Sequence, residues 1–250
     1  MGYGSYQATD WQKLKQSRGI NASSEVKDMF AKSAKDKYLP KYFDKRESFD
    51  SVDSPDSTPI IIAFDDTASM GYLAKEIATN ALNKTILEIY DKKPVTNPHV
   101  CCATFGNNTD FAPLQVTQFE ADVRVAEQLF DLYIEQGGNG YSGDPYVWYF
   151  AAKHTKIDSY EKRHKKGFLF TIGDDFCKNS VIKGMEKREI KDIFGDDIDE
   201  DLITPEQAYE MACEKYNVFH IIVKPLCLPQ RAFANLLPDN FRIPYMRPPC

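Results

Sequence analysis

From about residue 58 onward, short continuous apolar runs alternate with apolar residues that are spaced like one face of a helix. Residues 60–64 (Ile-Ile-Ile-Ala-Phe) are continuously apolar, which is typical of a strand buried on both faces of a parallel sheet. Leu73, Ile77 and Ala81 then recur every four residues and predict an amphipathic helix directly after that strand. The repeated alternation predicts a doubly wound, mostly parallel α/β sheet with helices on both faces.

The remaining elements follow from the same patterns. Residues 114–119 alternate strictly between apolar and polar side chains, so we expect a half-exposed, antiparallel edge strand there. The stretch 204–207 (Thr-Pro-Glu-Gln) combines a capping box with proline at the first helical position, which marks the start of a helix. A second strand is predicted at 100–105, another buried strand at 167–172 and a last strand at 218–223, and further helices are predicted at 125–133 and 146–154.

Residues 1–57 are polar and contain no strand-like run, so we interpret them as an N-terminal arm. Within this arm a short amphipathic helix is predicted at 24–34, and the aromatic tract 38–43 is expected to dock on the main body. The main domain is predicted to span residues 58–224. Residues 225–250 are expected to form a C-terminal extension that packs on this domain.

The overall charge and hydropathy narrow the choice of partners. The 250 residues carry a formal net charge of −6 at pH 7, which argues against a nucleic-acid partner because phosphate binding generally needs a basic face. At the N-terminus, no positively charged segment followed by an apolar one marks a signal peptide, and no apolar stretch approaches the roughly 18 residues of a membrane span. We therefore expect a cytoplasmic protein without a membrane partner.

Oxygen-bearing side chains follow two of the predicted strands. Asp65, Thr67 and Ser69 come directly after the first predicted strand of the domain, and Asp174 follows a later one. In doubly wound sheets, ligands bind outside the carboxyl ends of the strands, so we expect these side chains to lie together. The sequence therefore predicts a site at this edge of the sheet.

A glycine-rich loop at 137–143 lies between these two segments and carries Asn139 and Ser142. Carboxylates and hydroxyls without a converging histidine or cysteine form a hard-oxygen site suited to Mg²⁺, or to Mn²⁺ or Ca²⁺. Because Mg²⁺ keeps several waters, a few direct protein ligands suffice. The neighbouring residues Asp66 and Asp175 are expected to be solvated or to support the ligands from behind.

The stretch Asp65-x-Thr67-x-Ser69, followed by Met70-Gly71, resembles the metal-ion-dependent adhesion site of von Willebrand factor A (VWA) domains, which lies between the first strand and the first helix. The resemblance implies that Thr67 and Ser69 contact the metal and that Asp65 acts through water. It also implies a late aspartate after a buried strand, and Asp174 occupies that place.

The family's site also has a threonine in a Gly-Gly loop, where this chain has Asn139 and then Ser142. The sequence leaves open which of the two replaces the threonine. Three further stretches resemble a bacterial and phage group of stand-alone VWA domains, and a phage-encoded member would act in the host cytoplasm. The resemblance covers roughly residues 57–224, and the three stretches are Ser57–Ala63, Trp148–Ala152 and Phe168–Asp174.

The resemblance implies a function as well as a fold. In such domains an acidic residue of a partner protein completes the shell of the metal, so we expect a divalent-metal-dependent protein-binding domain of the adhesion or scaffold type without a catalytic group. Sequence spacing assembles no Ser/His/Asp or Cys/His arrangement. His220 lies within a predicted strand and is interpreted as a packed core residue.

Three other interpretations stay open. The same motif resembles the nucleophile loop of haloacid dehalogenase-like phosphatases, in which Asp65 would attack phosphorus, Asp174 would hold Mg²⁺ and Lys166 would be a charge partner. Against this enzyme, the helix begins at Met70-Gly71 and leaves no room for a flap hairpin. Alternatively, Asp65 and Ser69 cap the first helix. Finally, the fold could bind no metal and serve as a structural or virion scaffold.

Overall fold

The structure is a computed structural model that describes most of the chain. Asn139, Asp175 and the predicted extension at 225–250 lie outside the described residues, and for Ala8 and Ser69 the backbone alone is described. No helix in the described part of the chain is long and apolar enough to cross a membrane. The described ranges are 6–21, 23–137, 140–174 and 183–223.

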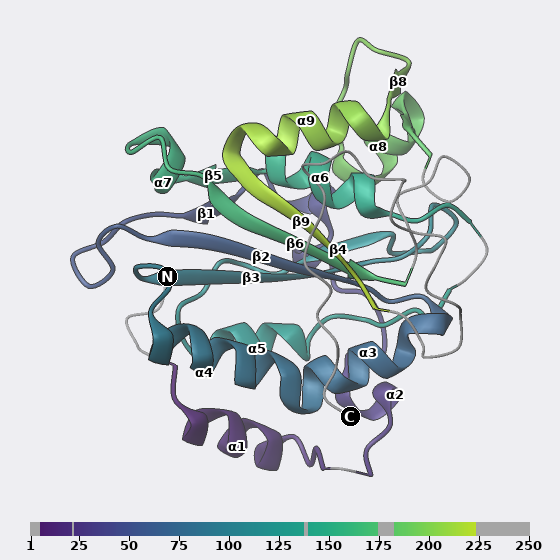
Figure 1. Ribbon diagram of the computed structural model, residues 1–250. Coiled ribbons are helices and arrows are strands. Elements are labelled where there is room, and N and C mark those ends of the chain that lie inside the picture. The colour runs from purple at the N-terminus through teal and green to yellow at the C-terminus, as the bar shows by residue number, and fades with distance from the viewer. Residues whose placement is uncertain (1–5, 22, 138–139, 175–182, 224–250) are drawn as a thin grey trace, which may run out of the picture.

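Five strands form a central sheet in which one edge strand is antiparallel to its neighbour and the other pairs are parallel (Figure 1). The strands are β2 (Thr58–Asp65), β3 (Pro98–Phe105), β4 (Leu114–Val116), β6 (Gly167–Gly173) and β9 (Tyr216–Ile222). Their order across the sheet is β4-β3-β2-β6-β9, with β4 as the antiparallel edge. This arrangement confirms the predicted α/β class with a mostly parallel sheet.

Helices cover both faces of the sheet (Figure 1). One face carries α3 (Gly71–Glu76), a π-helical turn (Ile77–Ala81), α4 (Leu82–Lys92) and α5 (Arg124–Leu129). The other face carries α6 (Asp144–Lys153), α8 (Lys187–Phe194) and α9 (Pro205–Lys215). Smaller elements are α7 (Asp158–Glu161) and the antiparallel pair β7 (Met185–Glu186) and β8 (Leu202–Ile203).

Alternate residues of β2 contribute to two separate hydrophobic cores. Ile61 and Ala63 pack in the core beneath α6, α8 and α9. Ile60, Ile62 and Phe64 pack in the core beneath α3, α4 and α5. Both faces of β2 are therefore buried, as the continuous apolar run predicts.

The helix predicted after β2 is present, but it contains the π turn. Ala74, Ala78, Leu82 and Ile86 recur every four residues, and each is at most 3% exposed. A regular α-helix has 3.6 residues per turn, so a spacing of four gradually rotates such positions away from the core. The wider π turn between α3 and α4 compensates for this rotation and keeps the four side chains on one face.

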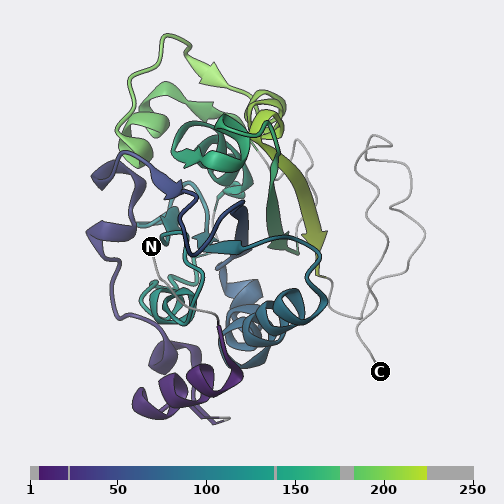
Figure 2. The same cartoon turned by 90° about the vertical axis from the view of Figure 1, so that its left-hand side faces the viewer.

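The N-terminal segment wraps around the domain on the side of α4 and α5 (Figure 2). Its helix α1 (Ala8–Ser17) brings Trp11 against Phe130, with ring centroids 5.6 Å apart. The helix predicted at 24–34 is short, because α2 covers Val26–Met29 alone. The segment ends in β1 (Arg46–Ser48), which pairs with β5 (Thr155–Ile157) in parallel.

The edge strand β4 is fully buried, so the expectation of a half-exposed strand at 114–119 is wrong. The N-terminal segment covers it: Arg46 donates a hydrogen bond to the carbonyl oxygen of Val116 at 2.9 Å. Gln115 is 0% exposed, and its amide donates to the carbonyl oxygen of Tyr133 at 2.6 Å. Docking of the tract 38–43 is confirmed, since Tyr38, Leu39 and Pro40 are buried.

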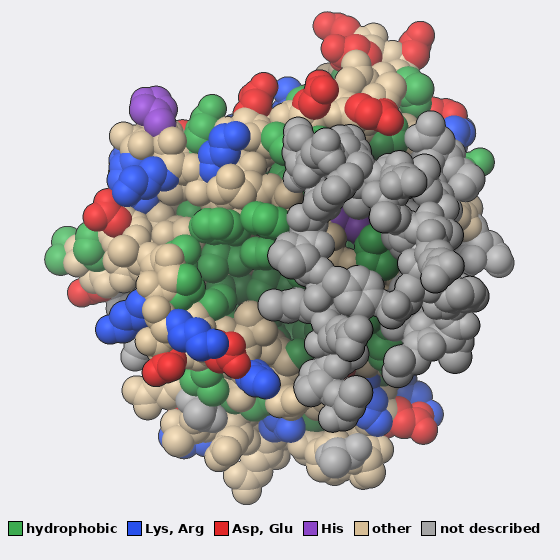
Figure 3. All heavy atoms as spheres, viewed as in Figure 1, with side chains coloured by type: hydrophobic (Ala, Val, Ile, Leu, Met, Phe, Trp, Pro, Cys, Tyr) green, Lys and Arg blue, Asp and Glu red, His purple; other side chains and the backbone are tan. Residues whose placement is uncertain are grey.

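β6 is buried on one face and partly exposed on the other in the described structure. Phe168, Phe170 and Ile172 are partly exposed, and the Phe170 ring stacks on Phe219 of β9 at 5.2 Å. Figure 3 shows a patch of apolar side chains over this part of the sheet. The expectation that 167–172 is buried on both faces is therefore wrong for the side that α3, α4 and α5 leave open.

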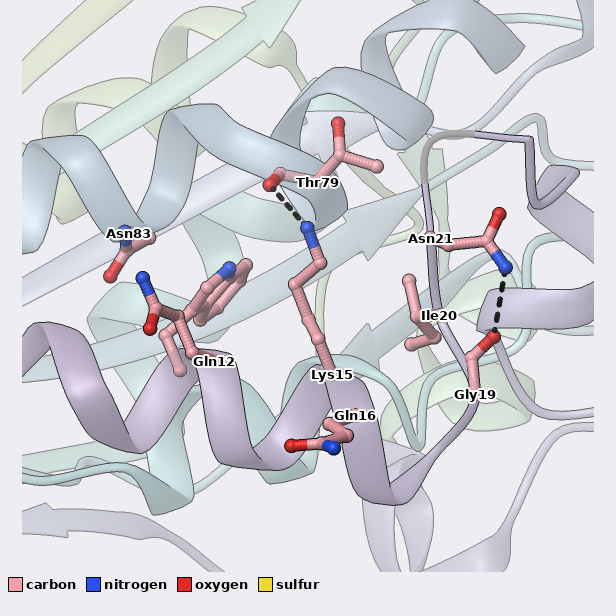
Figure 4. A pocket seen from close by; sticks show the side chains of 9 residues that line it. Gln12, Lys15, Gln16, Gly19, Ile20, Asn21, Thr79 and Asn83 are labelled. Carbon is pink, nitrogen blue, oxygen red and sulfur yellow. Dashed lines mark hydrogen bonds between the residues drawn. The ribbon is translucent and has the colours of Figure 1, made fainter.

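A surface groove of about 590 Å³ lies between α1 and the π turn (Figure 4). The side chain of Lys15 points across it and donates to the carbonyl oxygen of Thr79 at 3.2 Å. Gln12 and Asn83 carry further amides into the lining. The lysine thus ties α1 to a carbonyl of the π turn.

Candidate functional site

Asp65 is the last residue of β2 and shapes the loop that follows. Its side chain is buried (3% exposed), and Oδ1 accepts a hydrogen bond from the backbone N–H of Thr67 at 2.8 Å. Aspartate commonly stabilises a turn in this way. Helix α3 begins after Met70, which provides no side-chain cap. Asp65 therefore orders the loop before the helix and does not cap α3.

The end of β6 lies directly beside Asp65. Phe64 and Ile172 are partners in the parallel register, so Asp65 and Gly173 come next on neighbouring strands. A Cβ atom on Gly173 would lie 3.5 Å from Oδ2 of Asp65. Asp174 follows, and its charge acts on the Asp65 carboxyl group. The structure thus brings Asp65 and Asp174 to the same edge of the sheet.

The pKa of Asp65 is raised from its ordinary value to about 7. Burial is the largest cause, because desolvation disfavours the charged form of a carboxyl group. Hydrogen bonds from the Thr67 side chain and backbone lower the pKa, whereas the charges of Asp144 and Asp174 raise it. Three carboxyl groups from three separate segments therefore act on one another here.

Ser142 lies on the glycine-rich loop just before α6 and is 8% exposed. Its hydroxyl donates to Oδ2 of Asp144, in the first turn of α6, at 2.7 Å. The loop approaches the end of β3 closely, since a Cβ atom on Gly143 would lie 2.6 Å from the carbonyl oxygen of Gly106. Ser142 is thus linked to the Asp65 edge through Asp144.

His220 on β9 completes a polar cluster beneath this loop. Its side chain is 7% exposed, and Nδ1 lies 3.3 Å from Oδ1 of Asp144 and 2.9 Å from the hydroxyl of Thr171. Ser142, Asp144 and His220 therefore lie together, although sequence spacing assembled no such group. The serine hydroxyl donates to the carboxylate and not to the imidazole, so the order differs from that of a Ser-His-Asp nucleophile.

Asp144 is the residue of this site that the sequence interpretation missed. It is 2% exposed, and Oδ1 makes no hydrogen bond. One signal could have found it: a carboxylate in the first turn of a predicted helix, directly after a loop already assigned to the site. Ser69 and Asn139 receive no side-chain placement, because they lie outside the described side chains.

Lys166, the charge partner in the phosphatase interpretation, lies at the opposite end of the sheet. It precedes Gly167 at the amino end of β6, whereas Asp65 is at the carboxyl end of β2, and these strands run parallel. A side chain there cannot reach a phosphate held at Asp65. That role for Lys166 is wrong.

The donors at this edge suit a hard cation held by hydroxyls, carboxylates and water. Among the described residues, no group of three or more His, Cys, Asp or Glu side chains is arranged to hold an ion by itself. A Mg²⁺ ion does not require such a group, because it keeps several waters in its shell. Oδ1 of Asp144, which makes no hydrogen bond and has Nδ1 of His220 at 3.3 Å, fits an acceptor for one of those waters.

Comparisons with known proteins give a weak structural likeness. No model of a known family and no curated protein matches the chain. Among solved structures, the chain is similar to the crystal structure of the pilus adhesin SpaC from Lactobacillus rhamnosus GG in its open conformation. The TM-score is 0.37 at 11% sequence identity, and the match spans 58% of this chain and 16% of the adhesin chain. A likeness at this level assigns no family.

Proposed function

We propose that this protein is a VWA-type domain that binds another protein through a divalent cation. Mg²⁺ is the first choice, with Mn²⁺ or Ca²⁺ as alternatives. When bound, the ion supplies a positive centre with an open coordination position, and an acidic residue of the partner protein fills it. The residues that would hold the ion are Asp65, Thr67, Ser69 and Asp174, with Asn139 or Ser142 from the loop.

One observation carries this proposal. The carboxyl groups of Asp65, Asp144 and Asp174 come from three chain segments and interact electrostatically at one edge of the sheet. Among the ion pairs of the described residues, none connects any of these three carboxyl groups to a lysine or an arginine. The imidazole of His220 lies near Asp144 and balances its charge when protonated. Gathering carboxylates without a basic partner is unfavourable, and a bound cation removes that cost.

The topology of the sheet supports the same place. The chain passes from β2 to β3 on one side and later returns to β6 on the other side of β2. The strand order therefore reverses between β2 and β6, and ligands of open α/β sheets bind outside the carboxyl ends of the strands at such a point. Asp65 and Asp174 follow from these two strands.

Exposed aromatic side chains on the neighbouring segments favour a protein as the partner. Phe111 is 78% exposed, Tyr72 is 48% exposed and Tyr141 is 40% exposed. They lie on the β3–β4 loop, in the first turn of α3 and on the loop before α6. Partial burial raises the pKa of Tyr72, and the nearby charge of Asp174 raises it further. Exposed aromatic residues are enriched in protein interfaces.

A hollow of about 260 Å³ beside Ser142 extends this surface. Tyr141 and Tyr146 line it together with both basic and acidic side chains, among them Lys183 and Glu189. Lys183 lies over the Tyr141 ring at 5.5 Å, and the Tyr146 hydroxyl donates to Glu189 at 2.5 Å. A partner whose acidic residue binds the ion would place its neighbouring side chains in this hollow.

Calorimetric titration of the chelator-treated protein with Mg²⁺ and Mn²⁺ tests the metal. We expect the variants Asp65→Asn and Asp174→Asn to weaken binding by at least about tenfold, as loss of a metal-site carboxylate does. Asp197→Asn is the matched control, because Asp197 is exposed and pairs with Lys191 away from the site. Unchanged metal binding in folded Asp65→Asn would contradict the proposal.

The partner is tested separately. Immobilised wild type should capture a protein in Mg²⁺ and release it in chelator, and Asp65→Asn should not capture it. Metal binding without metal-dependent capture would leave an ion with a structural role and overturn the adhesion function. Metal-dependent release of phosphate from a phosphomonoester would instead support the phosphatase.

A further inference from the structure

Asp66, the residue after Asp65, is a buried carboxyl group without a partner. It is 1% exposed, and neither of its carboxylate oxygens makes a hydrogen bond of normal geometry, although the backbone N–H of Glu135 is near enough to oppose the rise in its pKa. Its backbone N–H donates to the carbonyl oxygen of Phe105 at 3.0 Å, which fixes the residue between the ends of β2 and β3. Of the two expectations for Asp66, solvation is therefore wrong, and support of the ligands from behind stays a prediction. A buried polar group of this kind is costly unless something else binds it.

Asp110, on the loop between β3 and β4, places a second carboxylate beside Asp66. A Cβ atom on Gly106 would lie 2.2 Å from Oδ2 of Asp110 and 2.9 Å from Oδ1 of Asp66. The two oxygens thus lie side by side over the glycine. On the opposite side, a Cβ atom on Gly137 would lie 2.0 Å from Oδ1 of Asp110. Two glycines therefore form a cradle in which any side chain would displace these carboxylates.

Glu135 adds a third negative group to this cradle. Its two carboxylate oxygens accept hydrogen bonds from the backbone N–H groups of Phe111 at 2.9 Å and Ala112 at 3.0 Å. Its charge acts on both Asp66 and Asp110. Among the ion pairs of the described residues, none involves these three acids, so no basic side chain is seen to balance them.

We infer that Asp66 and Asp110 are the charged ligands of a second divalent cation, distinct from the one proposed at Asp65. Two carboxylates balance the charge of one divalent ion, and both point into a cradle without a basic residue. Both Glu135 oxygens already accept hydrogen bonds from Phe111 and Ala112, so among the described residues Asp66 and Asp110 would be the acidic ligands, and backbone carbonyls and water would complete the shell. Calcium accepts such a mixed oxygen shell with irregular geometry, so Ca²⁺ is the ion that fits best.

The two proposed sites lie on opposite sides of the end of β2. Asp65 is beside Gly173 of β6, whereas Asp66 is beside Gly106 at the end of β3. The second ion would tie the loop after β2 to the loop between β3 and β4, and it would therefore stabilise the fold near the first site. This inference does not depend on the proposed function at Asp65.

Calorimetric titration of the chelator-treated full chain with Ca²⁺ tests this second site. We expect Asp66→Asn and Asp110→Asn each to lose one equivalent of bound Ca²⁺ or to weaken that equivalent by at least about tenfold. Asp65→Asn should keep the equivalent, which separates failure of this inference from failure of the first site. Asp197→Asn again serves as the surface control.

Thermal unfolding with and without Ca²⁺ gives a second readout, and it guards against variants that bind poorly because they fold poorly. The wild type and Asp65→Asn should gain melting temperature on addition of Ca²⁺, and the two cradle variants should lose this gain while remaining folded in chelator. If folded Asp66→Asn and Asp110→Asn bind Ca²⁺ as the wild type does, the inference is wrong. It is equally wrong if the wild type gains nothing from Ca²⁺, since Asp66 and Asp110 then share a proton.

Discussion

Asp65 and Asp66 are consecutive and almost completely buried, yet their surroundings differ. Asp65 accepts hydrogen bonds from Thr67 and lies beside β6, whereas Asp66 has the backbone N–H of Glu135 nearby without a hydrogen bond of normal geometry and lies beside the end of β3. Burial is the largest cause of a raised pKa at both residues, and at Asp66 the charges of Asp65 and Asp110 raise it further. Neighbouring residues of a strand point to opposite sides, so one strand end supplies two separate acidic environments.

The largest expected effect is the pH dependence of the metal-free protein. The folded state keeps the Asp65 proton up to about pH 7, whereas the ordinary pKa is 3.8. A raised folded-state pKa stabilises the protein at low pH, and this stabilisation is lost as the pH rises towards 7. The shift corresponds to about 4 kcal/mol across this range.

Urea unfolding in chelator between pH 4 and pH 8 measures this loss. Asp65→Asn should flatten the pH dependence relative to the wild type, while Asp66→Asn should retain the part that belongs to Asp65. Identical pH profiles for the wild type and Asp65→Asn would show that Asp65 ionises normally.

Two glycine-to-alanine substitutions compare how tightly the two sides of the end of β2 are packed, because each adds one methyl group and no charge. Gly106→Ala should cost about 2 kcal/mol and remove the Ca²⁺-dependent gain, because the new methyl group meets both cradle carboxylates. Gly173→Ala should cost less than about 0.5 kcal/mol, because its nearest contact would be an ordinary 3.5 Å to Asp65. Equal costs in urea unfolding would show that the cradle is not tightly packed.

Neutralising Asp66 should stabilise the metal-free protein. Asp66→Asn removes a buried carboxyl group that has no hydrogen-bond partner, and we expect the free energy of unfolding in chelator at pH 7 to rise by about 1 to 2 kcal/mol. Asp65→Asn also removes a buried ionisable group, but its amide N–H₂ replaces an oxygen that faces hydrogen-bond donors of Thr67, so its gain at that pH should be smaller than the shift of the Asp65 pKa alone implies. A loss of stability in Asp66→Asn would indicate that the Asp66 carboxyl group makes a stabilising hydrogen bond, for example with the backbone N–H of Glu135.

The smallest effect is expected at the loop that carries Ser142. Ser142→Ala removes the 2.7 Å hydrogen bond to Asp144 and should lower the free energy of unfolding by about 1 kcal/mol. Ser159→Ala is a matched control, because Ser159 is also buried but its hydroxyl has no hydrogen-bond partner. The control should be neutral or slightly stabilising, and a cost equal to that of Ser142→Ala would exclude a specific role for the Ser142 bond.

The elements that could be predicted from the sequence are those buried by their neighbouring strands and by the helices that cover the sheet. The run 60–64 is apolar on both faces because helices cover both faces of β2. The strict alternation at 114–119 was misleading, because Gln115 is buried where it hydrogen-bonds to Tyr133, and Arg46 of the N-terminal segment hydrogen-bonds to Val116, so segments beyond the strand decide its burial. Long-range cover of this kind leaves no local pattern.

The candidate site divides in the same way. The proximity of Asp65 and Asp174 follows from strand ends, which a topology rule can locate. The contacts among Ser142, Asp144 and His220 depend on where the loop before α6 packs against β9. The spacing of these residues along the chain does not predict that packing. The burial of Asp66 was missed because an acidic residue at a loop is ordinarily solvated.

The packing of residues 6–48 on the domain limits how far the chain can be truncated from its N-terminus. Trp11, Phe30 and Tyr38 belong to the same core as α4 and α5, and β1 is hydrogen-bonded to β5. A fragment that begins at residue 58 would expose a hydrophobic surface, including the aromatic ring of Phe130, and we expect it to aggregate. A display scaffold built from this protein should keep its leading fifty residues and carry any grafted peptide on the acidic loop around residues 199–201, beyond Asp196, which hydrogen-bonds to Tyr149 and His154.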